Sequence, residues 1–386
     1  GGDIITFIRR AENLDYVEAV RLLAERAGLN LPEDERDEAG RWKMRLLECN
    51  RAAAHFFHDT LASPAGARGL RYLRSRALGD GTIRRFGLGY APAGWDALTG
   101  FLRTKGYSRE ELIEARLASS GRKGDGCFDL FRDRVMFPII DVRGNVVGFG
   151  GRALEDGGPK YLNSPDTAVF KKSRNLFALE KAKGSKSSSL ILAEGYMDVI
   201  ALHQAGFTNA VATLGTALTS EQTSLIAKYA EEVILSYDSD GAGQKATRRA
   251  IGLFAQTGVR VRVLHMEGAK DPDEYIKRFG ATRFKMLLEG SRGAVEFEIE
   301  RLRSGFDLET AEGKVGFLGE FVRLMAGIPN AIERDVYIRR TAGEVGVSPE
   351  AVEERVRLER KRQRSGEERR QQRDLKMYAG AGAVAA

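Results

Sequence analysis

Apolar and polar residues alternate with a helical period at the start of the chain. Between Asp15 and Gly28 the apolar residues fall three or four positions apart, which predicts a helix with Asp15 as its N-cap and Gly28 at its end. Two further helices are predicted at about 41–61 and 65–76. The first part of the chain is therefore expected to be mostly helical.

The pattern changes to short apolar runs between residues 128 and 177. Runs at 135–140 and 146–149 flank Arg143-Gly144-Asn145, and the Gly and Asn of this tripeptide suit a tight turn. This segment predicts a β-hairpin.

From residue 190 the predicted strands and helices alternate. Strands are expected at 190–193, 209–212, 233–237 and 259–265, with helices beginning near 197, 220 and 244. Such alternation indicates βαβ units on a parallel sheet. After about residue 283 the pattern is helical again, and Ser348-Pro349 predicts the start of a last, Arg- and Glu-rich helix at about 350–376.

Composition favours a soluble protein with an anionic partner. The 386 residues suffice for two or three domains, and 61 Lys and Arg against 54 Asp and Glu give a net charge of +7. Residues 122–186 alone carry an excess of five positive charges. A nucleic acid is the first partner that this balance suggests, and a membrane surface is the second.

Other classes are excluded by what the sequence lacks. The two cysteines, Cys49 and Cys127, belong to no Cys-x-x-Cys pair, which argues against a disulfide scaffold and a cysteine zinc cluster. No apolar run approaches the roughly 20 residues of a membrane span, and no secretory leader opens the sequence. We expect a cytoplasmic protein without a membrane partner.

Acidic residues follow three of the predicted strands. These residues are Glu194 and Asp198, Asp238 and Asp240, and Asp271 and Asp273. Because ligands of open α/β sheets bind at the carboxyl ends of the strands, the three pairs are expected to share one crevice. Carboxylates gathered in this way repel one another unless a cation compensates, and an all-oxygen ligand set selects a hard cation such as Mg²⁺.

Each acidic pair also has a simpler interpretation. Asp-x-Asp-Gly after a strand is more often a turn and a helix cap than a metal site. An EF-hand is excluded because Ala242 and Arg249 occupy positions that its ligands require. The presence of three pairs after three strands favours the metal site.

Several motifs resemble a known family. Glu194-Gly-Tyr-Met-Asp198, Asp238-x-Asp240-Gly-x-Gly243 and Asp271-x-Asp273 resemble the Toprim signature of bacterial primases, type IA and II topoisomerases and some nucleases. The segments at 134–138, 148–152, 159–165 and 170–172 resemble the basic half of the RNA polymerase domain of DnaG-type primases, which topoisomerases lack. The resemblance extends from Gly1 to about Ile338. It implies an α/β fold, α+β overall, in which a Toprim Rossmann-like parallel sheet is flanked by a basic mixed α/β N-terminal subdomain and a C-terminal helical bundle.

The resemblance also implies roles for individual residues. Glu194, Asp238 and Asp240 would be catalytic, with Glu194 either a general acid/base or a metal ligand. Mg²⁺ or Mn²⁺ would be held mainly by Asp238 and Asp240, with Asp198, Asp271 and Asp273 as supporting acids. Nucleotide and DNA contacts are implied for Arg76, Arg134, Arg152, Lys160, Tyr161, Asn163 and Lys172.

A domain plan follows from the same resemblance. It comprises a remnant after a zinc module at 1–40, a basic subdomain at 41–184, a Toprim subdomain at 185–282, a helical subdomain at 283–348 and a charged linker or tail at 349–386. Zinc is expected only in an N-terminal module absent from this chain. The replicative helicase is expected to bind a C-terminal domain that is also absent.

The function implied is that of a primase catalytic core. It would synthesise short RNA primers on a single-stranded DNA template from ribonucleoside triphosphates, as a monomer at the bacterial replication fork, and leave an RNA–DNA hybrid. Two alternatives stay open. A Toprim nuclease would use water as its nucleophile, and a non-catalytic single-stranded DNA-binding module would not depend on Glu194 or Asp238.

Overall fold

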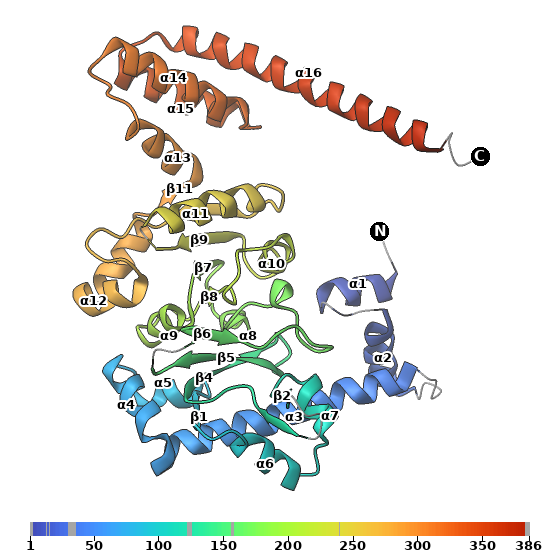
Figure 1. Cartoon of the computed structure of the whole chain (residues 1–386). Coiled ribbons are helices and arrows are strands. Elements are labelled where there is room, and N and C mark those ends of the chain that lie inside the picture. The colour runs from blue at the N-terminus through green and yellow to red at the C-terminus, as the bar shows by residue number, and fades with distance from the viewer. Residues whose placement is uncertain are drawn as a thin grey trace. The chain divides into compact units, whose positions relative to one another are not determined.

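The computed structural model describes residues 3–12, 14, 16–29, 36–121, 126–155, 158–238 and 240–382. Asp15, the predicted N-cap, lies outside the described residues. The chain divides into two compact units, residues 1–291 and 292–386, which are described separately (Figure 1).

The first unit begins with helices, as predicted. They are α1 (Ile4–Ala11), α2 (Tyr16–Arg26), α3 (Arg36–Ala62), the 3-10 turn η1 (Pro64–Gly66), α4 (Ala67–Ser75), α5 (Asp80–Arg85), α6 (Ala97–Thr104) and α7 (Arg109–Glu114). The predicted helices at 41–61 and 65–76 correspond to α3 and α4. The long α3 packs along the first sheet, where Phe57 meets Phe149 edge to face with ring centroids 5.4 Å apart.

The first of the two sheets in this unit is antiparallel, in the order β1-β4-β5-β6, and its strand β1 lies between α5 and α6 in the chain. Its strands are β1 (Gly89–Ala91), β4 (Arg134–Ile140), β5 (Val146–Ala153) and β6 (Tyr161–Asn163), and a separate hairpin pairs β2 (Ala118–Ser120) with β3 (Cys127–Asp129). The predicted hairpin is confirmed as β4–β5. In its turn the Asp141 carboxylate accepts hydrogen bonds from the N–H groups of Arg143 and Asn145, and Gly144 supplies a φ of +93°.

The second sheet of this unit is parallel, with β10, β9, β7 and β8 as neighbours in that order. Its strands are β7 (Ser189–Ala193), β8 (Ala210–Ala212), β9 (Glu232–Ser236) and β10 (Arg260–Val263). Its helices are α9 (Tyr196–Gln204), α10 (Ser220–Ile226), α11 (Gly241–Phe254) and α12 (Pro272–Glu289), preceded along the chain by η2 (Lys172–Arg174) and α8 (Leu179–Ala182). The predicted α/β class is confirmed.

Tyr196 connects the two sheets. Its ring stacks on Phe137 of β4 at 5.0 Å and meets Phe177 edge to face at 4.8 Å. Its hydroxyl donates a hydrogen bond of 2.8 Å to the Asn163 side chain. Gly150 of β5 must lack a side chain, because a Cβ there would lie 2.6 Å from the Tyr196 ring. These contacts fix the start of α9, and with it the position of Glu194.

The second unit is helical and has its own core. It contains the short β11 (Arg292–Gly293) and the helices α13 (Ala294–Arg303), α14 (Ala311–Ala326), α15 (Ala331–Val345) and α16 (Pro349–Gly382). Phe317, Phe321 and Met325 of α14 are fully buried. The predicted cap is confirmed, since the Ser348 hydroxyl accepts a hydrogen bond of 3.2 Å from the N–H of Ala351. Within the described part of both units, no helix is both long and apolar enough to cross a membrane.

Candidate active site

The first two acids meet at the carboxyl ends of β7 and β9. The strands are parallel neighbours in which Ala193 lies opposite Ser236, so Glu194 and Asp238 leave the sheet at nearby points. The N–H of Asp238 donates a hydrogen bond of 3.2 Å to the Glu194 carboxylate. The predicted convergence of these two sequence-distant acids is thus visible as a direct contact.

Asp240 and Asp271 begin helices. The Oδ1 atom of Asp240 accepts hydrogen bonds from the N–H groups of Ala242 and Gly243, at 2.9 and 2.8 Å. This cap starts α11 at Gly241, three residues before the predicted start. Asp271 caps α12 in the same way through a 2.8 Å bond from the Glu274 N–H. Both acids are therefore helix caps, as the simpler interpretation predicts. The cap hydrogen bonds use only Oδ1 of each carboxylate.

Gly243 brings the first turn of α11 against Asp238. A Cβ at Gly243 would lie 2.0 Å from the carbonyl oxygen of Asp238, a distance that no side chain could occupy. The glycine of the motif is required by this close approach between two backbone segments.

Burial and neighbouring acids raise the pKa of three carboxyl groups in the cluster. Burial, followed by the charges of Asp271, Asp238 and Asp273, raises the pKa of Asp198 to about 8. Burial and then the charge of Glu194 raise the pKa of Asp238 to about 6, and burial and Asp240 raise the pKa of Glu194. Asp198 also accepts a 3.1 Å hydrogen bond from the Gly195 N–H. Burial and the neighbouring negative charges thus both disfavour the ionised forms of these carboxyl groups.

Asp273 differs from the other acids because cations already neutralise it. Its carboxylate is buried and accepts a 2.6 Å hydrogen bond from Lys277 and a 3.4 Å hydrogen bond from Arg76. Asp273 therefore links the acidic cluster to Arg76, which follows α4.

The donor chemistry of the cluster fits a divalent cation. All the available ligand atoms are carboxylate oxygens. Burial and then repulsion between neighbouring acids raise the pKa values of Glu194, Asp198 and Asp238, and a bound cation would favour their ionised forms. Among the residues that the structure describes, however, no three acidic, His or Cys side chains already stand in a metal-binding arrangement. The acids are gathered, and binding would require their side chains to turn toward a common point.

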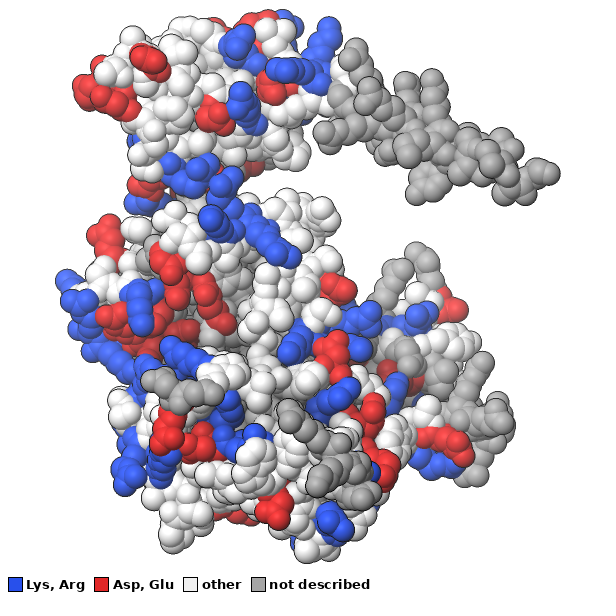
Figure 2. Space-filling model, viewed as in Figure 1, with Lys and Arg blue, Asp and Glu red and all other residues white. Residues whose placement is uncertain are grey.

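Two of the predicted basic residues form a row with aromatic rings. The guanidinium groups of Arg76 and Arg152 lie over the ring of Tyr72, at 5.6 and 5.0 Å from its centroid. Arg152 also lies 5.2 Å from the centroid of Tyr161 and donates a 3.0 Å hydrogen bond to its hydroxyl. Figure 2 shows acidic side chains gathered at the level of α9 and α12 and basic side chains bordering them.

The other predicted basic or polar residues have different surroundings. Arg134 is buried in β4 and donates hydrogen bonds of 3.0 Å to the carbonyl oxygens of Gly151 and Pro159. Asn163 bonds Tyr196 and the Leu214 carbonyl. The side chain of Lys160 is exposed and that of Lys172 is half-buried. Arg134 and Asn163 thus have structural contacts, whereas the two lysines are accessible from solvent.

Sequence reasoning missed two aromatic features. Tyr72 precedes Arg76 by one helical turn, and that spacing alone could have suggested a contact. A second cluster lies beside the β2–β3 hairpin, where Trp95 is 62% exposed, packs edge to face on Phe128 and carries Arg132 at 4.1 Å from its centroid. The guanidinium group of Arg132 also lies 5.5 Å from the centroid of the Phe128 ring. No sequence pattern indicates this second cluster, because the fold brings its residues together.

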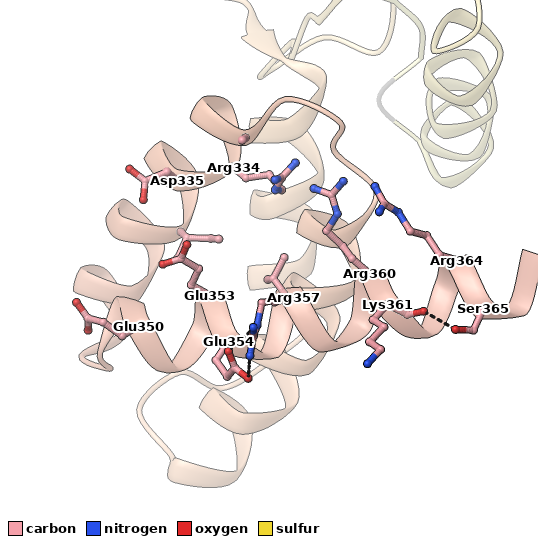
Figure 3. A pocket seen from close by; sticks show the side chains of 13 residues that line it. Arg334, Asp335, Glu350, Glu353, Glu354, Arg357, Arg360, Lys361, Arg364 and Ser365 are labelled. Atoms are coloured by element: carbon pink, nitrogen blue, oxygen red, sulfur yellow. Dashed lines mark hydrogen bonds and ion pairs between the residues drawn. The ribbon is translucent and has the colours of Figure 1, made fainter.

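The second unit has a groove of about 960 Å³ between α15 and α16. Figure 3 shows Asp335, Glu350 and Glu353 toward one end, and Arg334, Arg360 and Arg364 toward the other. None of the predicted site residues lines this groove.

Three family models match successive parts of the chain. Residues 56–183 match the N-terminal domain of the DNA primase catalytic core, residues 191–276 match the Toprim-like family, and residues 295–350 match the DnaB-helicase binding domain of primase. The prediction that helicase-binding sequence is absent from this chain is therefore wrong for residues 295–350. The hydrophobic pattern of this segment predicts only a helical bundle, because it reflects the buried core of the bundle and not a binding surface.

Bacterial DNA primases are similar over most of the chain. The DNA primase of Clostridium acetobutylicum is 38% identical over 355 residues, 91% of this chain and 59% of that protein. The DNA primase of Deinococcus radiodurans is 40% identical over 357 residues, 91% of this chain and 61% of that protein. The chain thus spans about three fifths of the length of these relatives.

Solved structures agree in fold. The RNA polymerase domain of Mycobacterium tuberculosis primase DnaG, in complex with a double-stranded DNA oligomer, aligns with a TM-score of 0.72 and 35% identity, covering 79% of this chain and 98% of that one. A DnaG primase catalytic domain bound to single-stranded DNA aligns with a TM-score of 0.69 and 32% identity, covering 81% and 99%.

Proposed function

Because this chain belongs to the DnaG-type DNA primase family, we propose that it is a catalytic core that synthesises short RNA primers on single-stranded DNA from ribonucleoside triphosphates. The observation that carries the proposal is the hydrogen bond between Asp238 and Glu194, close to Asp240, which caps α11. Asp273 joins this acidic cluster to Arg76, and Arg76 and Arg152 both contact Tyr72. An acidic centre and a basic face together suit nucleotidyl transfer, in which a 3′-hydroxyl attacks the α-phosphorus and pyrophosphate leaves.

The acids would hold the cations that this reaction needs. Bound Mg²⁺ or Mn²⁺ would activate the 3′-hydroxyl and neutralise the departing pyrophosphate. Asp238 and Asp240 would hold these cations at the carboxyl ends of the parallel strands, with Asp198 and Asp271 in support. Asp273, already paired with Lys277 and Arg76, would act by orienting Arg76.

Glu194 is proposed as the proton acceptor. Its pKa is raised by burial and by Asp240, which makes a carboxylate a better base near neutral pH. A Glu194→Gln variant that binds Mn²⁺ like the wild type but loses primer synthesis would support this role. Weakened Mn²⁺ binding would instead assign Glu194 as a ligand.

The basic subdomain is proposed to bind the triphosphate and the template. Lys160 and Lys172 offer accessible cations, and Arg76, Arg152 and Tyr161 form the face next to the acids. The exposed Trp95 and its partner Arg132 would stack on an unpaired base of the template, as aromatic and cationic side chains do in single-strand binding proteins. Replacement of Trp95 by Ala should weaken single-stranded DNA binding about tenfold, given the usual contribution of one stacked base.

We further propose the cellular setting of this core. It would work as a monomer in the bacterial cytoplasm at the replication fork and leave an RNA–DNA hybrid. Residues 295–350 would contribute to contact with the replicative helicase, in keeping with the family that they match.

The decisive experiment is primer synthesis on single-stranded DNA with labelled ribonucleoside triphosphates and Mg²⁺ or Mn²⁺. The wild-type chain should yield short RNA, and an Asp238→Ala, Asp240→Ala double variant should yield none. Degradation of the DNA without nucleotides would point to a Toprim nuclease. Single-stranded DNA binding without synthesis, unchanged in the double variant, would point to a binding module.

A further inference from the structure

The ring of Tyr72 in α4 has two cationic neighbours that come from different elements. Arg76 follows α4, and Arg152 lies in β5, yet both guanidinium groups stand over this one ring. Like charges gathered in this way repel one another, whereas the negative face of an aromatic ring attracts each of them. The ring is therefore one contact that the two arginines share, and it favours their position beside it.

Other contacts fix the outer sides of the pair. Asp273 pairs with Arg76, and Tyr161 accepts a hydrogen bond from Arg152. The Nε–H of Arg152 is buried without a partner among the described residues, so the donors of Arg152 are not all used within the protein. The Tyr72 hydroxyl is buried and has no hydrogen-bond partner of good geometry among the described residues, although it interacts electrostatically with Arg76. The ring is the part of Tyr72 that contacts both arginines.

We propose that Tyr72 is a positioning residue, whose ring holds Arg76 and Arg152 together as a preorganised receptor for the triphosphate of an incoming nucleotide. The inference rests on the proposed function in one respect, namely that a nucleoside triphosphate is the substrate. Two guanidinium groups that contact one ring suit a polyphosphate, because each presents several N–H donors to anionic oxygens.

The test compares Tyr72→Leu, which removes the ring, with Tyr72→Phe, which removes only the hydroxyl. A matched control is Tyr107→Leu, because Tyr107 also lies under an arginine, Arg45 at 4.3 Å, but packs against a different core. Binding of inorganic tripolyphosphate without divalent metal is measured by calorimetry, and KM and kcat for nucleotides are measured in primer synthesis. Thermal unfolding shows that each variant is folded, and Tyr72→Met replaces Tyr72→Leu if the latter does not fold.

Tyr72→Leu should weaken tripolyphosphate binding and raise KM by about tenfold while kcat changes much less, since a cation–π contact contributes on that order. Tyr72→Phe and Tyr107→Leu should resemble the wild type in both measurements. Unchanged binding and KM in a folded Tyr72→Leu variant would overturn the proposal, as would a Tyr72→Phe variant as weak as Tyr72→Leu. Wild-type protein that makes no primer would refute the proposed function alone, because the tripolyphosphate comparison does not require synthesis.

Discussion

Gly243 determines how closely α11 approaches the acidic cluster. A Cβ at Gly243 would lie 2.0 Å from the carbonyl oxygen of Asp238, whereas a Cβ at the nearby Gly241 would meet nothing within 4 Å. The two glycines of one motif therefore have different physical reasons to be glycine.

A Gly243→Ala variant should displace Asp238 and lower the rate of primer synthesis by at least about tenfold, with a loss of stability of about 1–3 kcal/mol from overpacking. Gly241→Ala is the matched control and should retain both activity and melting temperature. Primer yield and thermal unfolding measure the two effects. An active, stable Gly243→Ala protein would show that the loop can yield without moving its carboxylate.

Arg134 and Lys160 are two cations with different expected roles, because Arg134 is buried and hydrogen-bonded within the fold whereas Lys160 is exposed. Arg134→Met should remove a donor from the carbonyl groups of Gly151 and Pro159 and cost about 1–3 kcal/mol of stability. Lys160→Met, at an exposed position, should change stability by less than about 0.5 kcal/mol and should weaken binding of single-stranded DNA. Denaturant unfolding and fluorescence anisotropy distinguish these outcomes. Equal stability losses in both variants would contradict the distinction.

At the residue scale, the sequence predicts the positions of the acids better than the surroundings of the cations. An acid directly after an apolar run lies at a strand end, which local pattern alone indicates. The surroundings of Arg134, by contrast, depend on carbonyl groups that β5 and the following loop bring to it. The role of Tyr72 likewise depends on Arg152, which only the fold places nearby.

At the scale of elements, α9 is held to the sheet by a buried histidine. The Nε2 atom of His203 lies 2.9 Å from the Ala210 carbonyl of β8, and its ring packs edge to face on Phe86. Burial lowers the pKa of His203 to about 4, so the folded protein keeps this side chain neutral. An unfolded chain would protonate it near pH 6.5.

This difference predicts that stability is lost in acid. Above pH 6.5 both states are neutral at His203, and between pH 6.5 and 4 only the unfolded state gains the proton, which costs up to about 3 kcal/mol of folding free energy. Below pH 4 the loss is complete. The free energy of unfolding of the wild type minus that of His203→Gln should fall across this window, because the contributions of other groups cancel. A constant difference would mean that His203 is accessible to protons in the folded state.

Elements were predicted best where their ends carry their own signals. Ser348 and Pro349 locate the start of α16, and the hairpin turn carries its Gly and Asn. The sequence places the start of α11 three residues too late, because Asp240 is a helix cap as well as a candidate metal ligand. Treating Asp240 only as a candidate ligand therefore hides the helix start that it marks.

At the scale of the whole molecule, the two units have separate cores. The cluster around Phe317 and Phe321 draws all its members from residues 295–356. Residues 292–382 expressed alone should therefore unfold cooperatively in circular dichroism. Phe321→Ala should destabilise this fragment by about 3–5 kcal/mol, and Val315→Ala, 72% exposed on the same helix, by much less. A fragment without a cooperative transition would show that the second unit needs the first to fold.

The capping acids have a consequence for how such a sequence can change. Asp240 and Asp271 each use one oxygen to begin a helix, and an asparagine side chain can fill that role without the charge. The codons for these two amino acids differ by a single base. If these acids hold the metal as proposed, one point mutation would abolish activity while the protein still folds. An inactive relative of this kind would keep both helix caps, with asparagine in place of aspartate.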